Sequence, residues 1–124
     1  MNYDLEDRCA KFGEDMILFC KSIKPNEITR PLINQLVRSG TSIGANYMEA
    51  NQASSKKDFA NKIRISQKES NESKHWLRMI AMAIEEEKEV CRKFWQEAHE
   101  LTLIFAAISK SCKDGNGKEN SKGV

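Results

Sequence analysis

The sequence predicts an all-α protein that folds as an antiparallel, up-down-up-down four-helix bundle. Apolar residues recur at alternating spacings of three and four along most of its 124 residues, which is the period of an amphipathic helix. Only two prolines and six glycines are present, so long stretches contain no helix breaker. No segment alternates in the manner of a strand. Helices with short connections fold as a bundle, and the length fits one domain.

Four helices are expected, at about residues 4–22, 30–52, 56–83 and 87–111. The first ends before Pro25, because proline disfavours helical geometry in the residue before it. The second is expected to be capped by Thr29 or Arg30. Ser55 followed by Asp58 resembles a capping box for the third. The bundle therefore spans residues 1–112, and the polar tail, residues 113–124, is expected to be disordered.

A row of polar side chains follows one flank of the second helix, beside Gly40 and Gly44. If the second and third helices form a hairpin, facing residues have numbers that sum to about 106, which predicts an ion pair between Arg38 and Glu69. We interpret the row as a polar lock that joins the two helices, rather than as a catalytic site. Its members are Ser39, Ser42, Asn46, Glu49 and Glu69.

No arrangement of residues in the chain predicts catalysis. There is no nucleophile motif, Gly-rich phosphate loop or HExxH sequence. Glu72 and His75 form one half of a two-metal bundle motif, but the second copy is missing, because Gln96 stands before His99 at the matching position. We therefore expect no catalytic residue, no metal and no cofactor.

The cysteines and the absence of a targeting signal predict a cytoplasmic protein. None of the four cysteines forms a CxxC pair, so we expect them to be reduced residues of the core: Cys9, Cys20, Cys91 and Cys112. No run of about 18 apolar residues predicts a membrane span. The first residues lack the charged and apolar regions of a signal peptide.

The third helix is basic although the whole chain has a net charge of only +2. Between Ser55 and Arg78, seven basic and three acidic side chains give +4. Such a stripe binds phosphates with steep salt dependence, or it is simply a solvated face. The candidate nucleic-acid contacts are Arg38, Lys56, Lys57, Lys62, Arg64 and Lys68.

Several large apolar residues lie off the predicted seams of the third and fourth helices. They are Ile65, Trp76, Met79 and Trp95. A small bundle has little room for two tryptophans outside its main stripe, and tryptophan is favoured at subunit interfaces. We therefore predict that these residues form an oligomer interface. The alternative is that they cover the rim of the bundle.

Three segments together carry a resemblance to a known family. They are Arg38-Ser39-x-x-Ser42-Ile43-Gly44-Ala45-Asn46-Tyr47-x-Glu49-Ala50, Ser55-Lys56-Lys57-Asp58-Phe59 and Lys68-Glu69-x-x-Glu72-x-x-x-Trp76-Leu77. In order and at these spacings, they resemble the bacterial four helix bundle protein family, also called the 23S rRNA intervening-sequence protein family. The similarity runs from about residue 3 to residue 112.

The resemblance implies an antiparallel four-helix bundle that assembles into a ring-shaped homopentamer without enzymatic activity. In a related branch, the accessory protein of diversity-generating retroelements, a basic pentamer binds the reverse transcriptase and its template RNA. Our leading hypothesis is thus a non-catalytic oligomeric scaffold whose basic third helix binds structured RNA. The alternatives are a protein–protein adaptor without nucleic-acid binding and an accessory subunit of a reverse transcriptase.

Overall fold

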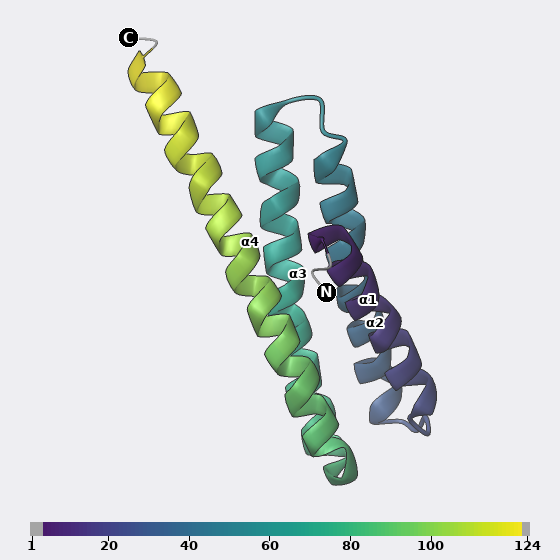
Figure 1. Ribbon diagram of the computed structural model, residues 1–124. Helices are drawn as coiled ribbons and strands as arrows, with labels where there is room; N and C mark the ends of the chain where they lie inside the picture. Colours follow the sequence, from purple (N-terminus) through teal and green to yellow (C-terminus); the bar gives the residue numbers. More distant parts are fainter. Residues whose placement is uncertain (1–3, 123–124) are drawn as a thin grey trace.

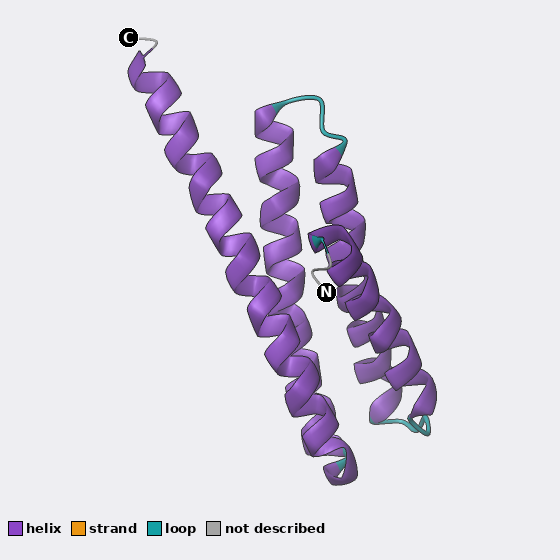
Figure 2. Ribbon diagram, viewed as in Figure 1, coloured by secondary structure: helices purple, strands orange, loops and turns teal. Residues whose placement is uncertain are grey.

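The computed structural model describes residues 4–122, and the side chains of residues 4–113. Its helices are α1 (Leu5–Ser22), α2 (Thr29–Asn51), α3 (Lys56–Ala83) and α4 (Lys88–Lys122). A short 3₁₀ turn, Glu85–Glu87, precedes α4. The part of the chain that the structure describes contains no strand (Figure 2). The prediction of an all-α protein with four helices is confirmed.

The helices pack in the order of the sequence, α1 against α2, α2 against α3, and α3 against α4. The turn between α2 and α3 lies at the end of the molecule opposite to the turns that join α1 to α2 and α3 to α4 (Figure 1). Side chains connect the first helix to the last: the rings of Phe19 and Phe94 lie 5.4 Å apart. Arg8 also donates to both carboxylate oxygens of Glu97, at 2.9 and 2.6 Å.

Local hydrogen bonds explain where the helices begin. The Asp4 carboxylate accepts from the backbone N–H of Asp7, and the Ser55 hydroxyl accepts from that of Asp58, as the capping-box pattern predicts. At α2, however, the prediction of a cap at Thr29 or Arg30 is wrong. The N-cap residue is Ile28, and the Asn26 side-chain oxygen accepts from the backbone N–H groups of Ile28 and Thr29, each at 2.9 Å.

The core consists of the inward residues that the spacing of three and four predicts. Its largest fully buried side chains are Phe12, Phe105, Met16, Leu36, Ile43, Ile63, Leu77, Ile80 and Leu101. Burying each contributes roughly 1.5–3 kcal/mol. In α4, Val90 precedes Phe94, which packs against the core, by four residues, yet Val90 is exposed and the next residue, Cys91, is buried. A 3₁₀ turn directly precedes α4 and has fewer residues per turn than an α-helix. It therefore changes which residues at the start of α4 face the core.

The structure continues α4 to Lys122, whereas the sequence predicted its end at residue 111. Helix propagation adds one hydrogen bond for each residue fixed, so a helix can extend past its last core contact without a new nucleus. Disorder of residues 113–124 in solution stays a prediction. No helix in the described part of the chain is both long enough and apolar enough to cross a membrane.

Candidate interaction surfaces

Buried serine hydroxyls join α2 to α3. The hydroxyl of Ser66 donates to the carbonyl oxygen of Ile43 across the interface at 3.0 Å. Those of Ser39 and Ser73 share a hydrogen bond of 2.9 Å. Within the described residues, every buried side-chain nitrogen or oxygen has a hydrogen-bond partner. These polar groups hold the hairpin together and leave no unsatisfied donor or acceptor for a ligand.

The ion pair that hairpin register predicts is present, and it includes a second carboxylate. Arg38 contacts the Glu69 carboxylate at 3.0 Å and the Glu72 carboxylate at 2.6 Å. The hydrogen bond from Arg38 holds the pKa of Glu72 below its usual value, and a weaker bond from Trp76 acts in the same direction. Because two carboxylates of the α2–α3 hairpin already bind the Arg38 guanidinium, Arg38 is a weaker candidate for a nucleic-acid contact.

The remaining members of the predicted polar lock divide into two groups. Glu49 crosses the interface and pairs with Lys62 at 2.7 Å. Ser42 and Asn46 instead donate to carbonyl oxygens of their own helix, at 2.6 and 2.9 Å. Such bonds back to the preceding turn satisfy the side chain locally. Of these three residues, only Glu49 contacts α3, so fewer residues join the two helices than the sequence predicted.

The solvent-facing side of α3 carries positive charge and no carboxylate. Besides Lys56 and Ala83 at the two ends of the helix, its exposed side chains are Lys57, Asn61, Arg64, Lys68, Asn71, His75, Arg78 and Met82. The three acidic residues of the helix are buried or half-buried elsewhere: Asp58, Glu69 and Glu72. From Lys57 to Arg78 the stripe extends about 30 Å, at 1.5 Å per residue. We call it the α3 basic face.

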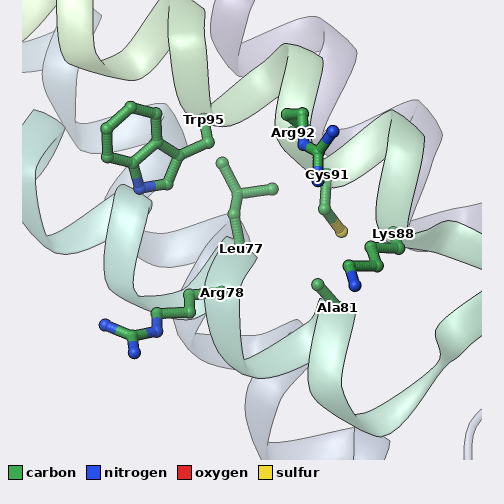
Figure 3. A pocket seen from close by; sticks show the side chains of 7 residues that line it. All are labelled: Leu77, Arg78, Ala81, Lys88, Cys91, Arg92 and Trp95. Carbon is green, nitrogen blue, oxygen red and sulfur yellow. The ribbon is translucent and has the colours of Figure 1, made fainter.

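A groove lies between α3 and α4 and has a volume of about 240 Å³. Figure 3 shows its lining: Leu77, Arg78 and Ala81 from α3, and Lys88, Cys91, Arg92 and Trp95 from α4. Apolar side chains form the floor, cations stand at the edge, and no carboxylate is among the lining residues described. We call it the α3/α4 groove.

Trp95 stands at one end of this groove and is held by two neighbours. Its ring stacks on that of His99, with centroids 5.0 Å apart and planes 16° from parallel. The Lys74 ammonium lies 5.1 Å from the Trp95 ring centroid and 3.1 Å from Nδ1 of His99. The indole is 36% exposed although it is fixed in place, which suits a contact with another molecule.

A second depression, of about 310 Å³, lies between α1 and α2 on another side of the bundle. We call it the α1/α2 trough. Several of its lining residues are small, and its only charged lining residues among those described are Glu6 and Glu14. Its lining residues are Glu6, Cys9, Ala10, Gly13, Glu14, Ile17, Thr41, Gly44, Ala45 and Met48. Two of them, Ile17 and Met48, remain 42% and 48% exposed.

The chemically reactive side chains are poorly placed for catalysis. Burial raises the pKa of Cys9 to about 12, and of Cys20 and Cys91 to about 11, so these thiols stay protonated. Throughout residues 4–113, no group of three potential metal-ligating side chains comes together. Glu72, the acid of the half motif, is occupied by Arg38, while His75 lies exposed against the edge of the Trp76 ring.

Comparison with known proteins decides the family. The profile of the 23S rRNA-intervening sequence protein family matches residues 2–101. The chain belongs to this family. A solved structure with 31% identity comes from Bacteroides thetaiotaomicron VPI-5482, a protein with unknown function from the S23 ribosomal protein family. It superposes with a TM-score of 0.76 and covers 85% of this chain and 97% of its own. No curated protein matches the chain.

In this member of the 23S rRNA-intervening sequence protein family, the four predicted interface residues do not form one exposed patch. Ile65, Trp76 and Met79 are half-buried, and Trp76 packs against the core. Only Trp95 is exposed. Its location on the α3/α4 groove separates it from the other three, whose role in assembly stays a prediction.

Sequence reasoning missed the exposed apolar residues of α1 and α2 in this family member. Ile17 and Leu18 sit between the inward positions Met16 and Phe19, and both are exposed. The signal in the sequence was four consecutive large apolar residues, more than one helix stripe accommodates. Met48 on α2 is also exposed, and it lines the α1/α2 trough.

Proposed function

We propose that the protein is a non-catalytic scaffold that binds structured RNA through the α3 basic face. The scaffold is an up-down-up-down bundle that assembles into a homopentamer in the cytoplasm. The observation that carries the proposal is the row of four exposed cations on one helix face, without an exposed carboxylate between them: Lys57, Arg64, Lys68 and Arg78. Such a row attracts the phosphates of a nucleic acid by counterion release.

The structure narrows the contacts that the sequence offered. Arg38 pairs with Glu69 and Glu72, and Lys62 pairs with Glu49, so carboxylates of the hairpin already balance the charge of both cations. Lys57 and Arg64 make no ion pair with any described residue. Phosphate contacts from α3 should therefore come first from these two side chains.

The lack of aromatic side chains on the α3 basic face favours recognition of the backbone rather than of bases. Its other exposed polar groups, Asn61, Asn71 and His75, can hydrogen-bond to phosphate or ribose oxygens between the cations. We therefore expect weak sequence preference and a strong effect of salt. The family name refers to an intervening sequence of 23S rRNA and does not name a ligand. The proposal that the protein binds RNA therefore rests on the charge pattern of the α3 basic face.

Absence of catalysis is supported by how the polar groups are used. Hydroxyls that would serve as nucleophiles, such as Ser66 and Ser73, are fully buried and hydrogen-bonded across the helices. A nucleophile needs an accessible position and an adjacent base. The carboxylates of Glu69 and Glu72 are paired with Arg38, which leaves them unsuited to proton transfer.

Filter binding to a structured RNA at two salt concentrations tests the proposal. Four phosphate contacts for each chain predict a slope of log K against log salt of about −3 to −4. Replacing Lys57, Arg64 and Lys68 by alanine should weaken binding and reduce the slope by about one for each cation lost. Alanine at Lys21, Lys24 and Arg30, which are exposed cations outside α3, is the matched control.

Two results would overturn RNA binding at this face: no binding at low salt, or equal binding by the α3 variant and the control. The protein–protein adaptor would then be the better function. It is favoured by exposed apolar side chains on other helices than α3, notably Leu18 on α1 at 64% and Leu103 on α4 at 55%. A reverse transcriptase is one proposed protein partner for such an adaptor.

A further inference from the structure

Two hollows on different helix pairs carry opposite charge. The α1/α2 trough has only Glu6 and Glu14 as charged lining residues, whereas the α3/α4 groove has Arg78, Lys88 and Arg92. The trough also exposes Ile17 and Met48, and the groove exposes Trp95, which a monomer would leave in water. Charge and hydrophobicity together mark both as contact surfaces.

The trough is shaped to receive a protruding side chain. Its lining includes Ala10 and Ala45, which are exposed and small, so another surface can approach the helix backbones closely there. Exposed Ile17 and Met48 also line the trough and offer apolar contact to what enters. An aromatic side chain with cations near it fits this trough, because the ring can pack on the apolar residues and the cations can pair with Glu6 and Glu14. An acidic surface would be repelled by these two carboxylates.

The groove face provides such a side chain. Trp95 is exposed at the surface, and stacking on His99 and the nearby Lys74 ammonium hold its ring. Lys88 and Arg92 lie on the same helix, on one side of Trp95 along the groove (Figure 3). A fixed tryptophan beside cations loses little conformational entropy on docking and is a typical centre of a binding interface.

We propose that the groove face of one copy, led by Trp95, docks on the α1/α2 trough of a second copy. The inference rests on the proposed self-assembly and assigns the two surfaces that mate. Trough against trough would bring carboxylates together, and groove against groove would bring cations together. Docking of unlike surfaces is heterologous, and repeated around an axis it closes a ring when the rotation allows.

Complementary charge reversal tests the assignment, with the mass of the full chain measured by light scattering across a concentration series. The trough variant is Glu6→Lys with Glu14→Lys, and the groove variant is Lys88→Glu with Arg92→Glu. All four positions are exposed, so the fold should be preserved, and circular dichroism checks it. Each variant alone should dissociate at a protein concentration at least about tenfold higher than the native chain.

The variant that carries all four reversals is the decisive one. It restores opposite charge at every contact between copies, so it should recover most of the native assembly. Matched controls change net charge equally at other exposed positions: Glu27→Lys with Glu86→Lys, and Lys21→Glu with Lys24→Glu. Both controls should keep the native mass.

The possible outcomes separate the face assignment from the proposed function. A monomeric native chain overturns self-assembly and the assignment with it. An oligomeric native chain whose trough and groove variants keep their mass overturns the assignment alone. If the groove variant keeps its mass and loses RNA binding, the groove belongs to an RNA surface and the assignment is wrong. The face assignment is supported if the trough variant and the groove variant each lose assembly and the variant with all four reversals recovers it.

Discussion

Gly40 and Gly44 lie one helical turn apart on α2 and face α1, yet alanine should have opposite effects at the two positions. A Cβ at Gly40 would lie 2.7 Å from Cγ of Met16 and 3.2 Å from its Cβ. Met16 is fully buried, and these atoms are close to its backbone, so α1 itself must shift. A Cβ at Gly44 would lie 3.5 Å from the nearest Cys9 atoms, which is ordinary van der Waals contact.

The magnitudes follow from two competing effects. Replacing glycine by alanine within a helix stabilises by about 0.5–1 kcal/mol, because alanine restricts the unfolded backbone more. Inserting a methyl group into a tightly packed core costs about 1–3 kcal/mol. Gly40→Ala should therefore destabilise by about 1 kcal/mol and Gly44→Ala stabilise by somewhat less. The two variants should differ by roughly 2 kcal/mol in the free energy of unfolding.

Urea denaturation followed by circular dichroism measures this difference. Because assembly makes stability depend on concentration, both variants and the native chain are compared at one protein concentration. In thermal melts, 2 kcal/mol corresponds to a separation of roughly 6–12 °C for a domain of this size. If Gly40→Ala is as stable as Gly44→Ala, the close contact between α2 and Met16 is wrong.

Three further results are expected. Ser66→Val removes the bond to the Ile43 carbonyl and adds bulk to a fully buried site, so urea titration should show a loss of about 2 kcal/mol. Arg38→Ala should reduce the free energy of unfolding most at neutral pH. Because Arg38 lowers the pKa of Glu72, this stabilisation is present above the unfolded-state pKa and disappears as pH falls through the folded value; an equal loss at pH 7 and pH 3 would contradict it. Titration of the native protein with a thiol reagent should modify Cys112, which is half-buried, well before the three buried thiols, Cys9, Cys20 and Cys91; rapid reaction of all four would show that the core opens.

The parts of the structure that could be predicted from sequence are those set by local periodicity and short turns. The seam of α1 and the Ser55 cap follow from residue spacing alone. The pairing of Arg38 with Glu69 could be predicted because a four-residue turn fixes the register of the α2–α3 hairpin. A short connection leaves two antiparallel helices few ways to align.

The surfaces could not be predicted because they depend on which flank of each helix a neighbour covers. Ile17 and Met48 look like core residues in the sequence, but within residues 4–122 no further helix covers the side of α1 and α2 that carries them. Lys62 looked like an available cation until the hairpin placed Glu49 beside it. Contacts between residues far apart in the sequence decide whether such side chains are exposed or paired. These contacts produce no periodic pattern in the sequence.

Self-assembly is tested most directly by the mass of the native full chain in solution, measured by light scattering at micromolar concentrations. One chain has a mass of 14.2 kDa. The proposed homopentamer predicts a single species with about five times this mass, which dissociates into smaller species when the trough carboxylates are reversed. A native chain that stays at 14.2 kDa over the whole concentration range would contradict the proposed scaffold.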